Sequence, residues 1–161
     1  MNIDFPTRLV YNRKAKGGRN VISTRGRYAI RILTDLAEHR GEGYIPMKDV
    51  AKRQEISLKY IERILPNFKI AGLIDSTHGK GGGYCLAKDP SAITLWEILS
   101  LAEGDLAPVA CLQKGAAVCL RAAECKTLPV WEKYYALTKD YFCGITLADL
   151  CNTPIENTYV I

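Results

Sequence analysis

Apolar residues between positions 24 and 39 recur at intervals of three and four, which is the spacing of an amphipathic helix. They are Ala29, Ile32, Leu33, Leu36 and Ala37. Ser23 stands where a helix-capping residue is expected, and the glycine-containing stretch 41–43 ends the pattern. The chain therefore predicts a helix over about residues 24–39.

Two shorter helical patterns follow, joined by a tight turn at residues 54–56. Pro46 opens the first pattern, over residues 47–53, because proline is favoured at the start of a helix. Ser57 caps the second pattern, whose apolar positions are Leu58, Ile61, Ile64, Leu65 and Phe68. Charged side chains occupy the opposite face of this second helix. The pair predicts a helix-turn-helix, a motif whose second helix enters the major groove of DNA.

A glycine run at residues 79–83 separates two short stretches, 73–76 and 84–87. Two strands around a glycine-rich turn are typical of a β-hairpin. A hairpin that directly follows a helix-turn-helix is a wing. The expected fold class is therefore mainly α with a small β-hairpin, a winged helix-turn-helix.

The second half of the chain predicts three further elements. Thr94 and Glu97 have the spacing of a capping box, and they begin a helix that reaches about Glu103. A longer helix is predicted at residues 127–143, and residues 146–149 predict a capped turn. The longer helix carries apolar residues four and three apart, the seam of a helix packed lengthwise on a partner. They are Val130, Tyr134, Leu137 and Tyr141.

These patterns divide the chain into five segments. Residues 1–20 form a flexible basic arm, and residues 21–90 form the winged helix-turn-helix. Residues 91–126 hold the linking helix and a loop with three cysteines. Residues 127–151 form a dimerisation helix and the capped turn, and residues 152–161 form a tail.

The net charge of +5 is concentrated in the N-terminal half. Residues 1–20 have five Lys and Arg against one acid, residues 21–90 have twelve against eight, and residues 91–161 have five against eight. A basic surface at one end suits a polyanionic partner such as double-stranded DNA. No stretch approaches the roughly 20 apolar residues that span a bilayer, so we expect a cytoplasmic protein without membrane contact.

The polar side chains of the second short helix, the wing and the first helix are candidates for DNA contacts. Lysine, arginine and tyrosine donate to guanine edges or to phosphate, and glutamate accepts from a cytosine amino group. A cation at the tip of a wing enters the minor groove. The candidates are Arg25, Arg27, Arg31, Ser57, Lys59, Tyr60, Glu62, Arg63, His78 and Lys80.

Nucleotide binding and catalysis are poorly supported by the sequence. In the glycine run, a dinucleotide fingerprint needs glycine at Tyr84, and a Walker loop needs serine or threonine at Gly81. The chain has two histidines, His39 and His78, and neither belongs to a recognisable catalytic arrangement. We therefore expect no enzymatic activity.

Three of the six cysteines lie in the aperiodic stretch 104–126. Cys111, Cys119 and Cys125 have seven and then five residues between them. Thiolates on such a loop suit a soft metal or an iron–sulfur cluster. Zinc, a redox disulfide and unligated thiols are the alternatives. The remaining cysteines fall on predicted strand or helix positions and are expected in the core: Cys85, Cys143 and Cys151.

Several stretches together resemble the IscR/NsrR/CymR family of bacterial winged-helix regulators. They are the run Ile-Ser-Thr-Arg-Gly-Arg-Tyr-Ala at 22–29, residues 56–73, the wing at 79–86 and the three-cysteine loop. The resemblance covers residues 21 to about 151. It implies a homodimer built on the long C-terminal helix and a pseudo-palindromic DNA operator. It also implies an iron–sulfur cluster, held by Cys111, Cys119 and Cys125, that sets DNA affinity.

The resemblance leaves the fourth cluster ligand open. Leu128 replaces the histidine of the IscR type, and Arg27 replaces the aspartate of some NsrR-type members. Glu124, Asp105 or a non-protein ligand are the alternatives. Family members usually begin just before the Ile-Ser-Thr run, which is consistent with a translation start at Val21 and a net charge of +1 from there on.

The last residues, Tyr159, Val160 and Ile161, resemble the C-terminus with which serine acetyltransferases dock into cysteine synthase. The CymR type of regulator uses cysteine synthase as its corepressor, and an apolar tip with a free carboxylate suits an anion pocket. The main expectation is a dimeric DNA-binding repressor controlled through an iron–sulfur cluster. One alternative is a regulator of cysteine and sulfur metabolism that senses through cysteine synthase, without a cluster. Another is a metal or redox protein that does not bind DNA.

Overall fold

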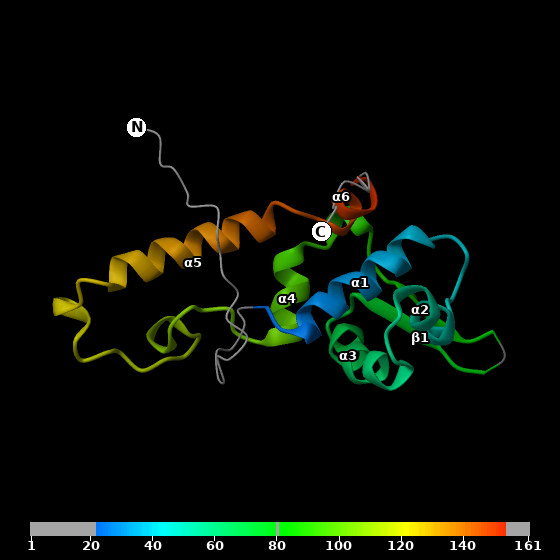
Figure 1. The fold of residues 1–161 in the computed structure, drawn as a ribbon, viewed down its shortest axis with the longest axis horizontal. Helices are drawn as coiled ribbons and strands as arrows, with labels where there is room; N and C mark the ends of the chain where they lie inside the picture. Colours follow the sequence, from blue (N-terminus) through cyan, green and yellow to red (C-terminus); the bar gives the residue numbers. More distant parts are fainter. Residues whose placement is uncertain (1–21, 80, 154–161) are drawn as a thin grey trace, which may run out of the picture.

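The computed structural model describes residues 22–79 and 81–153, and this part of the chain is mainly helical (Figure 1). In chain order the elements are α1 (Thr24–Glu38), α2 (Met47–Gln54), α3 (Leu58–Ile70), β1 (Ile74–Thr77), β2 (Gly83–Leu86), η1 (Pro90–Ala92), α4 (Leu95–Glu103), η2 (Ala110–Leu112), η3 (Ala122–Glu124), α5 (Leu128–Cys143) and α6 (Leu147–Cys151). The arm at 1–20, Lys80 and the tail residues Tyr159, Val160 and Ile161 lie outside the described residues.

The first helix, α1, forms as its apolar spacing predicts. The Ser23 hydroxyl accepts a hydrogen bond from the Arg25 N–H at 3.0 Å, which satisfies one of the free N–H groups at the start of the helix. The inner face of α1 is fully buried, with Ala29, Ile32, Leu33 and Leu36 in the core. Burial of each large aliphatic side chain of this kind contributes about 1.5–3 kcal/mol.

The predicted helix-turn-helix is confirmed in α2 and α3. Glu55 follows α2 in the left-handed conformation, with φ of 53°, and this reverses the chain toward α3. Ile61, Ile64, Leu65 and Phe68 are buried and hold α3 on the core. The side-chain cap expected at Ser57 is not formed: the Ser57 carbonyl accepts from the N–H groups of Tyr60 and Ile61, and its hydroxyl makes no capping hydrogen bond.

The predicted wing is an antiparallel hairpin of β1 and β2, with Ile74 opposite Leu86. A third segment joins it, because Ile45 and Tyr84 exchange two backbone hydrogen bonds of 2.9 Å. Gly83 permits this approach, since a Cβ there would lie 2.3 Å from the carbonyl oxygen of Ile45. The wing is therefore bonded to the chain that leads into α2.

The remaining short helices join the same core. Ile98 of α4 and Leu147 of α6 belong to one hydrophobic cluster with α1, α2 and α3. Thr94 accepts from the Glu97 N–H at 3.2 Å, but the Glu97 carboxylate pairs with Lys88 at 3.2 Å. The capping box expected at α4 is thus half formed, whereas α6 has a complete one between Thr146 and Asp149.

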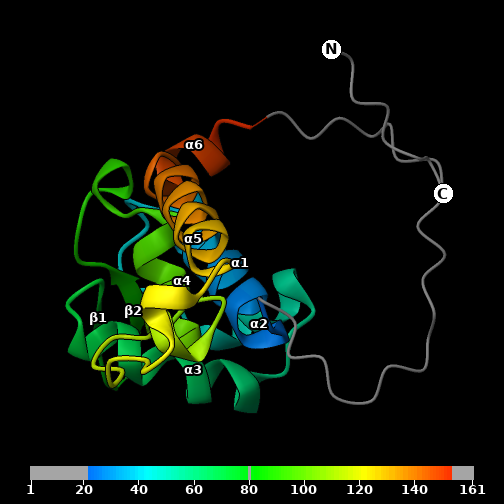
Figure 2. The same ribbon diagram turned by 90° about the vertical axis from the view of Figure 1, so that its left-hand side faces the viewer.

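The long helix α5 extends away from the rest of the fold, and Figure 2 views it nearly along its axis (Figures 1 and 2). It contacts α4 through Trp96 and Tyr135, whose ring centroids are 5.8 Å apart. None of its residues is buried. Within the described part of the chain, no helix has the length and apolar character needed to cross a membrane.

Candidate nucleic-acid interface

The outer face of α3 presents polar side chains to the surface, as the sequence predicts. Ser57, Lys59, Glu62 and Arg63 are exposed, and Tyr60 is half-buried. Their backbone is fixed by the buried face of the same helix, so the polar row has a defined position on the fold. Exposed cationic and hydrogen-bonding groups on a helix are the chemistry that reads base edges and phosphates.

Arg25 from the start of α1 and Arg63 from α3 line one small pocket of about 140 Å³, together with Tyr60 and Ile64. The fold thus brings together two guanidinium groups that are far apart in the sequence. Two planar cations beside a phenol suit a phosphate group, because guanidinium forms paired hydrogen bonds to such oxygens. Arg27 is also exposed, and it stands two positions after Arg25 in the sequence.

Arg31 has a different environment from the one the sequence suggests. Its Nε donates to the Gln54 side-chain oxygen at 3.2 Å, and its Nη2 donates to the Gln54 carbonyl. The guanidinium also lies 5.6 Å from the Tyr28 ring centroid, and Tyr28 meets Tyr60 edge to face at 5.4 Å. Arg31 therefore braces the turn between α2 and α3. Sequence reasoning missed Tyr28 and Gln54, since no local pattern marks either as a support for the motif.

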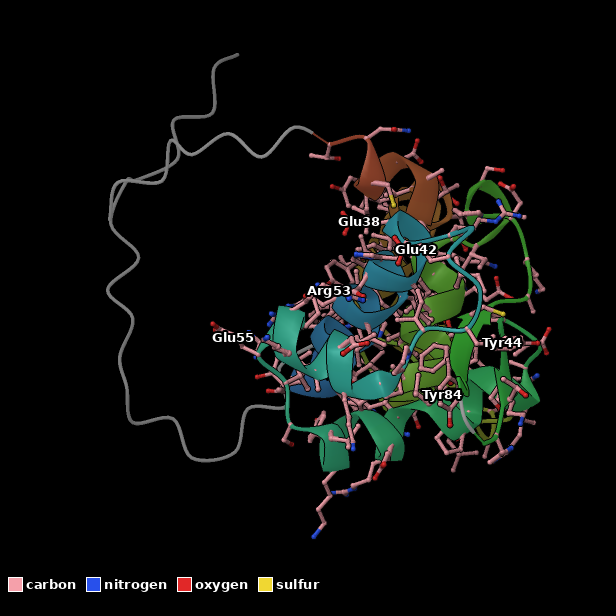
Figure 3. All side chains as sticks on the ribbon, turned by 90° about the vertical axis from the view of Figure 1, so that its right-hand side faces the viewer. Glu38, Glu42, Tyr44, Arg53, Glu55 and Tyr84 are labelled. Atoms are coloured by element: carbon pink, nitrogen blue, oxygen red, sulfur yellow. The ribbon has the colours of Figure 1, made fainter. Side chains whose placement is uncertain are left out.

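A buried carboxylate connects α1 to α2. Asp35 is 1% exposed and accepts from Arg53 at 3.0 and 2.5 Å and from Gln54 at 2.9 Å. Arg53 is labelled in Figure 3, which views the molecule from the right-hand side of Figure 1. Burial alone raises the pKa of the Asp35 carboxyl, but the hydrogen bonds from Arg53 and Gln54 outweigh burial and hold that pKa below its ordinary value. Asp35 is thus a charged anchor for the helix-turn-helix.

A cleft of about 500 Å³ separates α3 from the wing. Glu62 lines it from α3, and His78 and Tyr84 line it from the hairpin. His78 is exposed at the turn, where Gly82 permits a tight backbone: a Cβ at Gly82 would lie 2.7 Å from the Thr77 carbonyl. His78, predicted as a wing residue, therefore lines this cleft from the turn of the hairpin.

The three cysteines of the 104–126 loop are not brought together. Cys111 and Cys119 are exposed, and Cys125 is half-buried. Among the described residues, no three His, Cys, Asp or Glu side chains lie close enough to hold a metal ion. The donor chemistry fits an iron–sulfur cluster, since all three are free thiols, but their arrangement in this structure does not.

Two polar side chains organise this loop. The Asp105 carboxylate accepts from the Ala107 N–H at 2.8 Å and from the Lys114 N–H at 2.6 Å, so both of its oxygens are engaged by backbone. Cys125 Sγ lies 3.5 Å from the Thr127 hydroxyl, and hydrogen bonds from Thr127 lower the pKa of the Cys125 thiol. A lowered pKa favours the thiolate, which is the form that binds metals and reacts.

The expectation that the other cysteines are core residues is wrong for Cys143. It is exposed, because α5 has no buried face in the described chain. Cys85 and Cys151 are half-buried, and burial raises the pKa of the Cys151 thiol.

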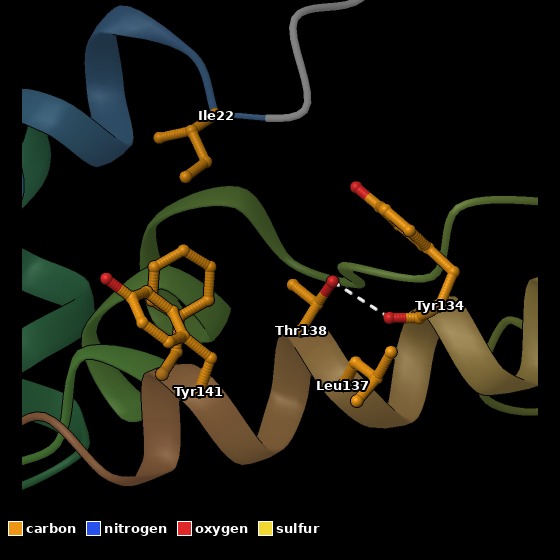
Figure 4. Close-up of a pocket in the computed structure, with 6 residues that line it drawn as sticks. Ile22, Tyr134, Leu137, Thr138 and Tyr141 are labelled. Atoms are coloured by element: carbon orange, nitrogen blue, oxygen red, sulfur yellow. Dashed lines mark hydrogen bonds between the residues drawn. The ribbon is translucent and has the colours of Figure 1, made fainter. Parts of the chain in front are cut away.

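The seam predicted on α5 is an apolar surface. Val130, Tyr134, Leu137 and Tyr141 are 42–65% exposed. Tyr134, Leu137 and Tyr141 line a hollow of about 470 Å³ together with Ile22, which precedes α1 (Figure 4). Exposed apolar patches of this kind mark contact surfaces.

Comparison with known proteins places this geometry in context. The family described as "Rrf2: Iron-dependent Transcriptional regulator" matches residues 22–153. The HTH-type transcriptional regulator IscR of Yersinia enterocolitica is 33% identical over 131 residues, which cover 81% of this chain and 79% of that protein.

Two solved structures share the fold. The structure of CymR (YrzC), the global cysteine regulator of B. subtilis, matches with a TM-score of 0.69 and 33% identity, over 81% of this chain and 95% of that one. T. potens IscR matches with a TM-score of 0.62 and 32% identity, over 80% and 84% of the two chains.

Proposed function

This chain belongs to the Rrf2 family of DNA-binding transcription regulators, and we propose that it is a repressor that binds its operator as a homodimer through α3 and the wing. The observation that carries the proposal is the exposed polar face of α3 beside the pocket of Arg25 and Arg63. In this proposal residues 21–90 contact DNA and residues 127–151 hold the dimer. The protein acts by binding rather than by catalysis.

The side chains of α3 divide into two roles. Lys59 and Arg63 donate to guanine edges or to phosphate, while Glu62 accepts from a cytosine amino group. Tyr60 and Ser57 contact the DNA backbone, and Arg25 and Arg27 meet phosphates at the first helix. Since Arg31 is already bonded to Gln54, its contribution is to present the turn rather than to reach far into the groove. His78 and Lys80 enter the minor groove from the wing.

The homodimer is supported by the apolar seam of α5. A helix with no buried residue and a row of half-exposed or exposed tyrosine, leucine and valine leaves apolar surface in water. A second copy laid along the same seam removes that surface, and each covered leucine or valine contributes about 1.5–3 kcal/mol. A two-fold dimer of this kind would also match a pseudo-palindromic operator.

The cysteine loop is the proposed sensor. We infer that Cys111, Cys119 and Cys125 hold an iron–sulfur cluster, which would supply a redox-active and ligand-sensitive centre to the loop. The support is the set of free thiols, the thiolate-favouring contact of Cys125 with Thr127, and the similarity to IscR proteins. Because both oxygens of Asp105 accept from backbone N–H groups, Glu124 or a non-protein ligand is the better candidate for the fourth position.

The test of DNA reading starts from operators enriched from random duplexes by the wild-type protein. Combined substitution Lys59→Ala and Arg63→Ala is expected to weaken operator binding at least about tenfold, because each base contact of this type is worth roughly 1–3 kcal/mol. Fluorescence anisotropy at one fixed salt concentration measures the effect. Lys139→Ala on α5 removes an exposed lysine elsewhere and serves as the control. Unchanged operator affinity in the double variant would refute the assignment of α3.

A regulator of cysteine metabolism that senses through cysteine synthase is the second candidate, and the similarity to the B. subtilis cysteine regulator favours it. In this version Tyr159 to Ile161 dock into cysteine synthase, although these residues lie outside the described structure. Deletion of residues 159–161 is expected to abolish co-elution with cysteine synthase on a sizing column. The candidate is discarded if the full-length chain itself does not co-elute.

A further inference from the structure

Glu103 reaches from the end of α4 to the start of α1. Its Oε1 accepts hydrogen bonds from the Ser23 N–H at 2.8 Å and from the Gly26 N–H at 3.0 Å. The two partners are 80 and 77 residues away in the sequence. A carboxylate at this place satisfies N–H groups that a helix leaves free at its first turn, and its negative charge faces the positive end of the helix.

Gly26 makes room for this carboxylate. Gly26 is buried in the first turn of α1, and a Cβ built there would lie 2.4 Å from Glu103 Oε1 and 3.1 Å from Leu99 Cδ2. Its backbone is ordinary helix, so the residue is not needed for an unusual conformation. Apart from proline, glycine is the least favourable residue inside a helix, and here its benefit is the space that the carboxylate occupies.

The contact lies between the cysteine loop and the DNA-binding face. Gly104 follows Glu103 directly and begins the loop, so Glu103 is the last residue of α4 before the cysteine loop. On the other side, Gly26 stands between Arg25 and Arg27, and Arg25 lines the pocket shared with Arg63. The Glu103 carboxylate thus lies between the proposed sensor and the proposed phosphate contacts.

We propose that Glu103 is a positioning residue that couples the shape of the 104–126 loop to DNA affinity, through its two hydrogen bonds to the first turn of α1. The inference rests on the proposed function and names the regulation of the same DNA-binding site. When the loop holds its described path, the carboxylate fixes the turn that carries Arg25 and Arg27. When the loop moves, the turn is released and those arginines lose their preset position.

Asp105 offers a way to loosen the loop without altering a cysteine. Its carboxylate joins Ala107 and Lys114 through two backbone N–H groups, so Asp105→Ala removes the link between the two ends of this part of the loop. In the otherwise wild-type chain, Asp105→Ala is expected to lower operator affinity at least about fivefold, within the usual range for coupled sites. In a Glu103→Ala background the same change is expected to have less than about a twofold effect, because the connection is already broken.

Three single variants accompany this comparison of Asp105→Ala with and without Glu103. Glu103→Ala is expected to weaken operator binding about tenfold, and Glu103→Gln, which keeps an acceptor oxygen, should restore most of that loss. Glu97→Ala is the matched control, because it removes another α4 carboxylate that pairs with Lys88 instead of with α1. With Glu97→Ala, Asp105→Ala should keep its full effect.

The amide of Gly26 gives a second readout that does not require the Glu103 variants to fold. Hydrogen exchange at this amide, measured by NMR, is expected to be at least about fivefold faster in Asp105→Ala than in wild type. Wild-type operator affinity in a folded Glu103→Ala, or an Asp105→Ala effect that is equal with and without Glu103, would overturn the proposal, as would unchanged Gly26 exchange. A wild-type protein that shows no preference for its enriched operator refutes the proposed function instead.

Discussion

At the scale of single residues, the ion pair of Asp35 and Arg53 determines how firmly α2 is held on α1. The Asp35 side chain is 1% exposed, while that of Arg53 is 34% exposed, so the pair joins the core to the surface. Removing the arginine would leave a carboxylate in the core with Gln54 as its remaining side-chain donor among the described hydrogen bonds. A buried charge without its partner is costly, because neither water nor an opposite charge compensates it.

We expect Arg53→Ala to lower the free energy of unfolding by about 2 kcal/mol, less than a fully buried pair would lose because Arg53 is partly exposed. Urea unfolding at pH 7 measures this loss. Arg40→Ala is the matched control, since Arg40 and Asp89 form an exposed pair that is worth about 0–1 kcal/mol. Equal losses in the two variants would contradict the role given to burial.

The same pair makes stability depend on pH. The pKa of the Asp35 carboxyl is lower in the folded chain than the value of about 3.9 expected in the unfolded one. The stabilisation is therefore fully present above about pH 3.9 and disappears as the pH falls through the folded pKa. Between pH 5 and acid pH, wild type should lose more stability than Arg53→Ala, in which the shift is reduced.

The sequence predicts which residues of a helix are exposed, but it does not predict contacts between residues that are far apart in the chain. The exposure of Lys59 and Arg63 follows from helical spacing, because apolar neighbours three and four positions away fix which side faces out. The contact between Glu103 and Gly26 could not be found this way, since their separation of 77 residues has no local pattern. Arg31 appeared to be a free cation in the sequence, and its bond to Gln54 depends on where α2 packs.

At the scale of elements, boundaries were predicted to within a residue or two where the pattern is long and amphipathic. α1, α3 and α5 all begin where a capping residue precedes an apolar repeat. The loop at 104–126 has no such repeat, so its two short turns at η2 and η3 and the positions of its cysteines had no basis in periodicity. The first part of this loop is held by Asp105, whose side chain accepts from two backbone N–H groups, a contact that sequence spacing does not encode.

The helix α5 carries a prediction at this scale. Leu137→Asp places a charge in the centre of the apolar seam, once on each copy, so we expect the dimer dissociation constant to rise at least about a hundredfold. Size-exclusion chromatography with light scattering measures the change. Lys139→Asp, on the same helix but off the seam, should leave the dimer intact. A dimer that survives Leu137→Asp would show that another surface holds the two copies.

At the scale of the whole molecule, the cysteine loop begins at the end of α4 that contacts the helix-turn-helix, where the Asn67 side chain of α3 donates to the Leu101 carbonyl at 3.3 Å. The described loop keeps its three thiols apart, so binding of a cluster requires a different path for residues 104–126. The sequence predicts these three donors but gives no information on their distances. That combination is expected of a loop that changes its conformation when it is loaded.

Anaerobic purification followed by absorption spectroscopy and iron and sulfide analysis tests this loading. We expect iron and sulfide in the wild-type protein and loss of most of both in Cys119→Ser, because a thiolate ligand is replaced by a hydroxyl that binds iron poorly. Cys143→Ser, which changes an exposed thiol on α5, is the control and should retain both. A colourless, iron-free wild-type protein would instead favour the cysteine synthase candidate.

The backbone bonds between Ile45 and Tyr84 have a consequence for the DNA itself. They join β2 of the wing to the segment before α2, so the span between this strand and the outer face of α3 is set by the protein and cannot stretch to suit each duplex. The duplex must then bring its own grooves to that span. Base steps that narrow or bend at little energetic cost would be selected beneath the wing, even where no side chain touches a base.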